Sequence, residues 1–300
     1  MIRNAVLLAF LMLSVIAPLA ADTIVQRGAA PTSLKTVVLR YGPHERQAMT
    51  IYPSQSGAPP PLAVYVHGGA WRAGRHERVG SKPRWFNEAG WAFASIGYRV
   101  LPDAPVEDQA RDLATGLRTL RREAKSLGFD SDRILLMGHS AGAHLAALLA
   151  SDDQWLGEDR RAIRGVILLD GAGYDVTGEF NRRGMLARKL YADAFGTAPQ
   201  RQRALSPLHH VDAGDPTDWL LVYARDRVDA VEQARSFGDT LQQAGLRVER
   251  VAEPRNHREI NQDFGTPGYL SNDAVRAMMA RIVCERVPSQ PSMRPGACGN

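Results

Sequence analysis

Metal-binding clusters, phosphate loops and internal repeats are not evident in this chain of 300 residues. No GxxxxGK phosphate loop and no GxGxxG dinucleotide fingerprint occurs, and only two cysteines are present. The sequence therefore predicts no metal centre and calls for no cofactor. With 44% hydrophobic residues the chain can still bury a large core, which favours one α/β-sized domain over two small ones.

Apolar runs long enough for export or membrane insertion are confined to the N-terminus. Residues 5–19 are apolar apart from one serine and one proline, follow Arg3, and precede small residues at positions 20 and 21. This is the pattern of a secretory signal, so residues 1–21 are predicted to be cleaved. A membrane anchor is the alternative, but the run is short for a spanning helix and has a proline near its end. The mature chain is expected to be periplasmic or secreted and free of the membrane.

The two cysteines fit an oxidising compartment. Cys284 and Cys298 lie near the C-terminus, away from the other motifs. An even cysteine count in an exported protein predicts one disulfide, which would tie the tail, residues 289–300, to the last helix. Two free thiols are the alternative, and they would count against both the bridge and export.

Neither sign of charge dominates the sequence. The formal net charge is +5, and basic pairs such as Arg121-Arg122 and Arg160-Arg161 are scattered along the chain among acidic residues. This distribution indicates solvated faces rather than a nucleic-acid groove. The sequence therefore predicts no nucleic-acid partner, and it leaves the oligomeric state open.

Apolar runs alternate with helical patterns along the body of the chain. Residues 36–40 and 48–52 alternate enough to form a hairpin. Buried strands are predicted at Leu62–Val66, Trp91–Ile96, Ile134–Met137, Val166–Leu169, Trp219–Tyr223 and Val248–Val251. Helices are predicted at Val106–Leu127, Ala230–Ala244 and Asp273–Glu285. The pattern predicts an α/β domain over residues 22–288, with a mostly parallel central sheet and helices on both faces.

Residues 177–212 interrupt this alternation. They mix apolar residues such as Phe180 and Phe195 with many arginines. We interpret the segment as a small helical insertion. It is either a lid over the cleft or an elaborated loop without a role in the chemistry.

The most informative motif is Gly138-His139-Ser140-Ala141-Gly142, between a strand-like and a helix-like run. A sharp strand-to-helix turn exposes the serine hydroxyl, and glycines at both ends remove side chains that would clash. The following helix directs its N-terminal amides at the site. A plain glycine turn would read the same in isolation, but the flanking strand and helix favour a nucleophile at Ser140.

A second motif, His67-Gly68-Gly69-Ala70-Trp71, directly follows the strand Leu62–Val66. Two consecutive glycines let backbone N–H groups face inward. The amides of Gly68 and Gly69, with that of Ala141 after the nucleophile, are the predicted oxyanion hole.

A serine nucleophile needs a base, and the chain offers eight histidines. His67, His139 and His144 belong to the motifs and are better explained as local packing or hydrogen-bonding residues. His257 follows the last strand and precedes the last helix, where a loop reaches the cleft, so we predict it as the base. The pair His209-His210 in the insertion is the main rival.

The third member of a triad orients the imidazole. Asp226 and Asp229 both follow the strand Trp219–Tyr223. We predict Asp226, on the loop at the strand end, and keep Asp229 as the alternative, because Asp229 is placed where it could simply cap the next helix.

These motifs resemble α/β-hydrolase fold esterases and lipases that carry an HGG motif, and especially the small bacterial esterases and arylformamidase-like enzymes. The resemblance spans about Val37 to Val287. It is carried by His67–Trp71, Gly97–Arg99, Gly138–Leu148, Asp226 with Val231–Gln233, and Asn256-His257. It implies a triad of Ser140, Asp226 and His257. One departure is that the family often has His-Gly before the acid, where this chain has Tyr223-Ala224-Arg225; Arg225 could pair with the acid or reach the substrate.

The expected activity is hydrolysis of carboxylic esters of small substrates through an acyl-enzyme. An aryl formamidase or amidase using the same residues is one alternative, and a non-catalytic binding module on this fold is another. Trp71 and Tyr98 are candidates for lining the substrate pocket, with core packing an equal alternative for each.

Overall fold

The computed structural model describes residues 36–54, 59–182 and 184–285. The predicted signal segment, residues 1–21, lies outside the described residues, and so do the tail, residues 289–300, and Cys298. Signal cleavage and the disulfide between Cys284 and Cys298 therefore stay predictions.

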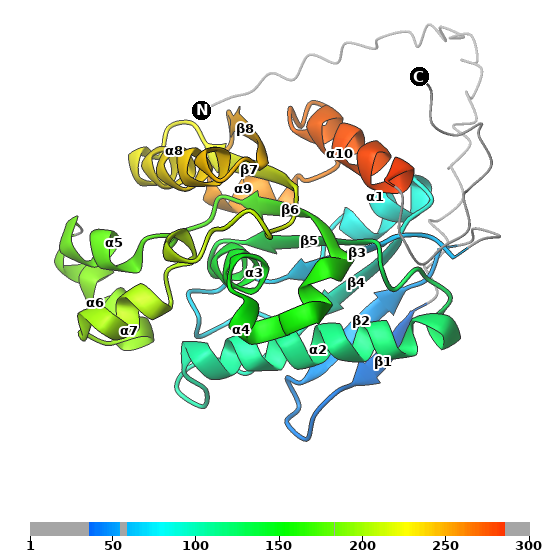
Figure 1. Ribbon diagram of the computed structural model, residues 1–300, viewed down its shortest axis with the longest axis horizontal. Coiled ribbons are helices and arrows are strands. Elements are labelled where there is room, and N and C mark those ends of the chain that lie inside the picture. The colour runs from blue at the N-terminus through cyan, green and yellow to red at the C-terminus, as the bar shows by residue number, and fades with distance from the viewer. Residues whose placement is uncertain (1–35, 55–58, 183, 286–300) are drawn as a thin grey trace, which may run out of the picture. The chain divides into compact units, whose positions relative to one another are not determined.

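Eight strands in the described residues form one sheet (Figure 1). They are β1 Val37–Arg40, β2 Ala48–Tyr52, β3 Leu62–Val66, β4 Ala92–Ile96, β5 Ile134–His139, β6 Ile163–Leu169, β7 Asp218–Ala224 and β8 Arg247–Glu253. Their order is β1-β2-β4-β3-β5-β6-β7-β8. Strand β2 runs antiparallel to β1 and β4, and the remaining neighbours are parallel. The predicted mostly parallel sheet is confirmed.

Helices cover both faces of the sheet because its central strands are apolar on both sides. In β3, Leu62, Val64 and Val66 point into one core, and Ala63 and Tyr65 into the other. This two-residue alternation is what a pleated strand buried on both faces requires.

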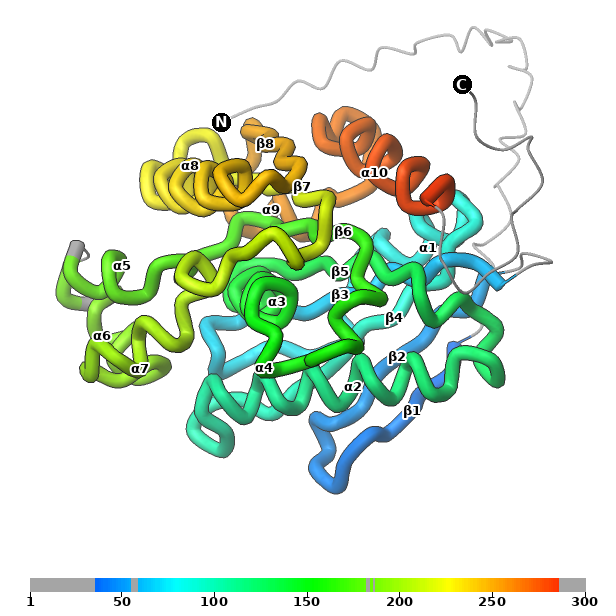
Figure 2. Tube along the Cα trace, in the orientation of Figure 1, coloured from blue at the N-terminus to red at the C-terminus, as the bar shows by residue number. Residues whose placement is uncertain are grey.

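Two sets of helices build these cores (Figures 1 and 2). The helices α2 Val106–Leu127, α3 Ala141–Ser151 and α8 Val228–Gln243 pack on one face. The helices α1 Lys82–Glu88, α9 His257–Gln262 and α10 Asn272–Cys284 pack on the other. Of these, α1 and α9 were not predicted, since each is only seven or six residues long and too short to show a helical repeat.

The segment between β6 and β7 is helical, as predicted. It contains α5 Val176–Arg182, α6 Met185–Phe195, α7 Pro199–Ala204 and the 3₁₀ helix η2 Pro207–His209. Arg201 binds both carboxylate oxygens of Glu107 in α2, at 2.7 and 2.8 Å, and the ring of Phe195 packs 4.7 Å from that of Trp71. The insertion is thus fixed to the body of the domain by a bidentate ion pair and by aromatic contacts.

Two short helical segments connect α3 to β6. They are α4 Asp153–Leu156 and the 3₁₀ helix η1 Gly157–Ala162. No helix among the described residues is both long and apolar enough to cross a bilayer.

Candidate active site

Ser140 occupies a strained turn between β5 and α3. Its backbone has φ 54° and ψ −121°, which lies outside the regions that L-residues prefer. The N–H of Ser140 donates to the carbonyl of Leu169 at the end of β6, at 3.0 Å. Backbone strain of this kind costs on the order of 1–3 kcal/mol and is held only by surrounding structure. The prediction that Ser140 stands on a sharp strand-to-helix turn is met.

The flanking glycines are required by close backbone contacts. A Cβ added at Gly138 would lie 2.2 Å from the carbonyl oxygen of Gly142. A Cβ at Gly142 would lie 2.3 Å from the oxygen of Val66 and 2.5 Å from that of His67. Helix α3 can therefore cross over β3 and β5 only if these positions lack side chains.

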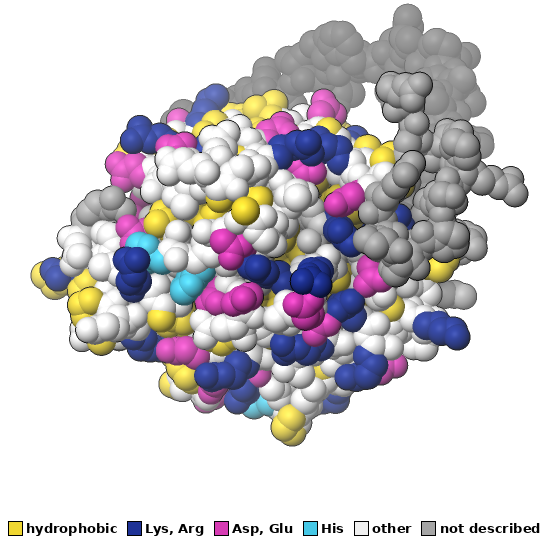
Figure 3. All heavy atoms as spheres, viewed as in Figure 1, with side chains coloured by type: hydrophobic (Ala, Val, Ile, Leu, Met, Phe, Trp, Pro, Cys, Tyr) yellow, Lys and Arg dark blue, Asp and Glu magenta, His cyan; other side chains and the backbone are white. Residues whose placement is uncertain are grey.

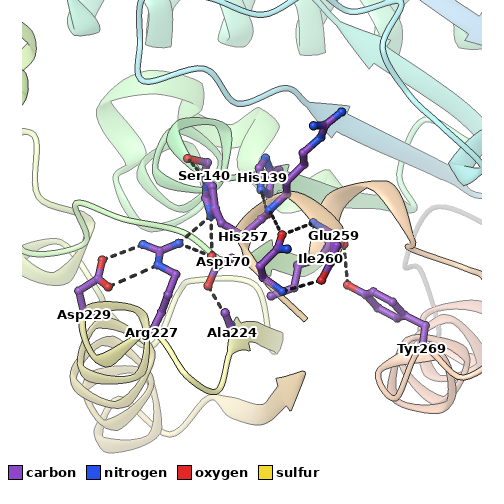
Figure 4. A network of polar contacts seen from close by, with 12 residues as sticks. His139, Ser140, Asp170, Ala224, Arg227, Asp229, His257, Glu259, Ile260 and Tyr269 are labelled. Atoms are coloured by element: carbon purple, nitrogen blue, oxygen red, sulfur yellow. Dashed lines mark hydrogen bonds and ion pairs between the residues drawn. The ribbon is translucent and has the colours of Figure 1, made fainter. Parts of the chain in front are cut away.

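His257 reaches this turn from the start of α9 (Figure 4). Its Nε2 lies 3.1 Å from the Oγ of Ser140. Helix α9 begins with a capping box: the Asn256 side chain accepts from the N–H of Glu259, and the Glu259 side chain accepts from the N–H of Asn256, both at 3.0 Å. The cap fixes where the helix starts and so holds His257, its first residue, over the serine.

The acid beside His257 is Asp170, which sequence reasoning missed. Its Oδ2 lies 2.5 Å from the Nδ1 of His257 (Figure 4). Asp170 follows β6 directly, is fully buried, and its Oδ1 accepts from the N–H of Ala224 at 2.9 Å. Ser140, His257 and Asp170 thus form a continuous chain of side-chain contacts.

The prediction of Asp226 for this position is wrong, and so is the alternative, Asp229. The side chain of Asp226 is 88% exposed and pairs with Arg225 at 3.7 Å. Asp229 binds the guanidinium of Arg227 at 2.7 Å. After β7 the N–H of Arg227 bonds back to the carbonyl of Ala224, a tight turn that points Asp226 to solvent and Arg227 to the site.

Arg227 occupies the space beside the acid. Its Nη1 pairs with Oδ2 of Asp170 and also lies 2.7 Å from the Nδ1 of His257. Burial by itself would raise the pKa of Asp170, but the bonds from His257 and Ala224 and the charge of Arg227 hold that pKa below its usual value. The carboxylate is therefore ionised at neutral pH. With the proton of His257 on Nδ1, this carboxylate accepts the N–H, and Nε2 faces Ser140 as an acceptor.

Asp170 did carry a sequence signal. It directly follows the predicted strand Val166–Leu169, just as Ser140 follows Ile134–Met137. The carboxyl ends of parallel strands meet at one edge of a sheet. Asp170 and Ser140 were therefore both candidates for a site at that edge. A second signal counted against Asp226: the His-Gly that often precedes the acid in the family is absent before this residue.

The other motif histidines have structural surroundings, as predicted. The ring of His139 contacts the His257 carbonyl at 2.9 Å, and the ring of His144 contacts the Leu205 carbonyl at 2.8 Å. Burial lowers the pKa of His139 to about 3 and that of His144 to about 4, so both stay neutral. His209 and His210, the alternative prediction for the base, lie in the insertion, where the ring of His209 is 3.9 Å from a carboxylate oxygen of Asp175.

The double-glycine loop lies against the serine turn. A Cβ at Gly68 would be 2.7 Å from the carbonyl oxygen of His139 and 3.0 Å from the Cβ of Ser140, so only a glycine allows this approach. Gly69 has φ 133° and its carbonyl accepts from the N–H groups of Arg72 and Ala73. Ala141 is the first residue of α3, and a first-turn N–H has no acceptor within its own helix. The loop and the helix N-terminus therefore converge beside the Ser140 hydroxyl.

Trp71 and Tyr98, predicted weakly as substrate contacts, are core residues. Trp71 is 2% exposed and packs on His144, Tyr191 and Phe195. Tyr98 is fully buried, and its hydroxyl donates to the carbonyl of His67 at 2.7 Å. Neither residue is among those that line the cleft at Ser140. Tyr98 instead stabilises the glycine loop through its hydrogen bond to His67.

A cleft of about 850 Å³ opens over Ser140 and His257. Its other lining residues come from β3, the loop at residues 67–80, α1, the end of β5 at His139, and α9. The described part of residues 177–212 contributes none of them, so a lid role for the insertion stays a prediction. Within the described ranges, no three His, Cys, Asp or Glu side chains are grouped as metal ligands would be.

A family model described as BD-FAE matches residues 49–241. The chain belongs to this family. Esterase LipQ of Mycobacterium tuberculosis is 29% identical over 87% of this chain and 65% of its own length. Kynurenine formamidase of Danio rerio is 25% identical, with 80% of each chain covered.

A probable isoprenylcysteine alpha-carbonyl methylesterase of Arabidopsis thaliana is 27% identical over 73% of this chain and 50% of that protein. The chain spans about half the length of such plant relatives. The structure of an esterase from Thermogutta terrifontis superposes with a TM-score of 0.67 and 22% identity, covering 85% of this chain and 95% of the other. This likeness, with the sheet order, shows the α/β-hydrolase fold.

The substitution Gly142→Ala should lower the free energy of unfolding by at least about 1–3 kcal/mol, because the new methyl group overlaps the carbonyls of Val66 and His67. Urea denaturation followed by circular dichroism measures it. Gly184→Ala is the matched control, since no described atom comes within 4 Å of a Cβ there. Equal stability of the two variants would contradict the described crossing of α3 over β3.

Proposed function

We propose that this protein is a serine hydrolase that cleaves carboxylic esters of small substrates. The observation that carries the proposal is the 3.1 Å contact between the Oγ of Ser140 and the Nε2 of His257, backed by the 2.5 Å contact to Asp170. A hydroxyl, an imidazole and a carboxylate in contact in that order are the groups that activate a serine for acyl transfer.

In the proposed reaction, the Oγ of Ser140 attacks the ester carbonyl while Nε2 of His257 takes its proton. The tetrahedral intermediate collapses, and His257 gives that proton to the departing alcohol. Water then enters, loses a proton to His257 and attacks the acyl-enzyme. The second tetrahedral intermediate collapses as His257 returns this proton to the Oγ of Ser140, which releases the acid and restores the free enzyme. Atoms and charges balance with water as the only co-reactant.

Asp170 stabilises the imidazolium that forms in both steps. Arg227 is a positioning residue: its guanidinium binds Asp170 and Asp229, so it fixes the carboxylate in place.

The N–H groups of Gly68, Gly69 and Ala141 are the proposed donors to the oxyanion. The close approach of Gly68 to Ser140 and the free first turn of α3 support this assignment. Fixed donors around a developing negative charge are worth about 2.7–4 kcal/mol each in comparable sites.

The relatives favour an ester substrate, since LipQ and the plant relatives are named as esterases. A formamidase is the second candidate, because the kynurenine formamidase match covers 80% of both chains. The proposed groups would serve either substrate, because both reactions pass through a tetrahedral oxyanion. Parallel assays on a phenyl ester and on an aryl formamide distinguish them.

Ser140→Ala should lower kcat for a short-chain p-nitrophenyl ester on the order of 10⁴-fold or more, because no nucleophile remains. Labelling by a fluorophosphonate probe should disappear as well. The control is Ser126→Ala, an exposed serine of α2. A labelled, active Ser140→Ala protein would end the proposal, and an unlabelled wild type would indicate a non-catalytic binding module.

Asp170→Asn should lower kcat on the order of 10⁴-fold, because an amide cannot stabilise the imidazolium or select the required tautomer. Asp226→Asn is the matched control and should stay within about twofold, since that side chain is 88% exposed. Steady-state kinetics on the same p-nitrophenyl ester measures both. A larger loss of kcat in Asp226→Asn than in Asp170→Asn would show that Asp226, and not Asp170, is the acid of the triad.

We also propose that the chain is exported and cleaved after residue 21. The charged start, the apolar run at residues 5–19 and the small residues before Asp22 support this. Mass spectrometry of the protein from the periplasm or medium of an expressing bacterium should give a chain that starts at Asp22. Full-length protein confined to the cytoplasm would refute export.

A further inference from the structure

The cleft over Ser140 is lined by charges of one sign. Arg75, Arg78, Lys82 and Arg258 all line it, and no aspartate or glutamate is among its described lining residues. By contrast, the face drawn in Figure 3 intersperses acidic and basic side chains. The cleft lining therefore differs in charge from the face drawn in Figure 3.

Lys82 is the buried member of this set. It begins α1, and only 1% of it is exposed to solvent. Its Nζ donates to the backbone carbonyl of Asn261 at 2.5 Å and lies 4.9 Å from the centre of the Tyr65 ring. These contacts leave the ammonium group with donor capacity that neutral partners do not use, since an ammonium carries three N–H bonds.

Lys82 has no acidic partner within the described residues. None of the ion pairs recorded there involves Lys82, nor do any involve the rim residues Arg75, Arg78 and Arg258. Burial without a counter-charge lowers the pKa of Lys82 to about 7. Buried charges are normally paired, so an unpaired ammonium in a cleft is an open place for an anion.

Helix α9 connects this ammonium to the reacting groups. Asn261, whose carbonyl accepts from Lys82, is four residues after His257 on the same helix. Residues four apart share one face of a helix and are separated by about 6 Å along its axis. An ester bound at Ser140 with a charged group one helical turn away would therefore reach Lys82.

We propose that the substrate is an ester carrying a carboxylate, and that Lys82 binds this carboxylate inside the cleft while Arg258, Arg78 and Arg75 attract it at the rim. This inference rests on the proposed function and specifies its substrate class. The exposed arginines act mainly on association and are screened by salt, whereas the buried ammonium is screened much less. Lys82 is therefore the specificity-determining residue.

The first experiment compares esters that differ only in charge. Monoethyl glutarate against ethyl pentanoate places the carboxylate on the acyl side, and 4-acetoxybenzoate against 4-acetoxybenzamide places it on the alcohol side. At low ionic strength kcat/KM should be about tenfold higher for the anionic ester in at least one pair, the size of one charge-assisted hydrogen bond. Hydrolysis is followed in a pH-stat for the first pair and by absorbance for the second.

The second experiment removes the charge. Lys82→Met should lower the anionic-to-neutral ratio of kcat/KM about tenfold, towards one. Lys125→Met, which removes an exposed lysine at the end of α2, should leave the ratio unchanged. If Lys82→Met does not fold, Arg258→Gln serves instead. It changes an exposed side chain and should lower the ratio about twofold at low salt.

The third measurement is the pH dependence of the same ratio. This ratio should fall between pH 6 and 8.5 as Lys82 loses its proton, because a neutral amine no longer attracts the carboxylate. Of the groups facing Lys82, His139 stays neutral because burial lowers its pKa, Tyr65 stays neutral because burial raises its pKa, and Asn261 and Phe264 carry no charge.

The outcomes separate the two proposals. Turnover of the neutral esters with no preference for the anionic partner in either pair overturns the carboxylate assignment and leaves the hydrolase intact. A preference that folded Lys82→Met leaves unchanged also overturns it, as does one that Arg258→Gln leaves unchanged where Lys82→Met does not fold. Absence of turnover of all four esters, together with no fluorophosphonate labelling, overturns the proposed hydrolase itself.

Discussion

The buried carboxylate of Asp170 is the interaction on which the site depends. It joins the ends of three segments, because the residue itself follows β6, its Oδ1 accepts from Ala224 at the end of β7, and its Oδ2 meets His257 after β8. Arg227 adds a charged partner. A carboxylate that is fully removed from water is stable only with such partners, so the same bonds that orient His257 also allow the charge to be buried. Chemistry and local stability are therefore coupled at one residue.

Close backbone packing determines the position of Ser140 and of the glycine loop beside it. The carbonyls of Val66 and His67 lie where a side chain at Gly142 would be, and the glycine loop touches the serine turn at Gly68. These contacts force Ser140 into its strained conformation and bring the first turn of α3 beside the hydroxyl. The strain is sustained because both neighbouring strands, β3 and β6, hold the turn, the latter through the bond from Ser140 to Leu169.

Charged side chains lie on both sides of His257. Asp170 and Arg227, an anion and a cation, both contact its Nδ1, whereas Arg75, Arg78, Lys82 and Arg258 line the cleft in which Ser140 lies. The charges behind the imidazole are therefore paired with each other, and those of the cleft lining are of one sign. On the face drawn in Figure 3 both signs are interspersed, so the cleft lining differs from that face in carrying one sign only.

The amino-acid sequence by itself determined the strands, the long helices, the serine turn and the late histidine, because hydrophobic periodicity and glycine spacing are local properties. Only the tertiary structure decided the acid. Asp226 and Asp170 both follow buried strands, and the choice between them depends on a tight turn after β7 that sends Asp226 to solvent and Arg227 inward. It also decided that Trp71 and Tyr98 are core residues, and that Lys82 lines the cleft with no acidic partner in the described part of the chain. Each of these depends on which distant segments pack together, and that is not encoded in the spacing of neighbouring residues.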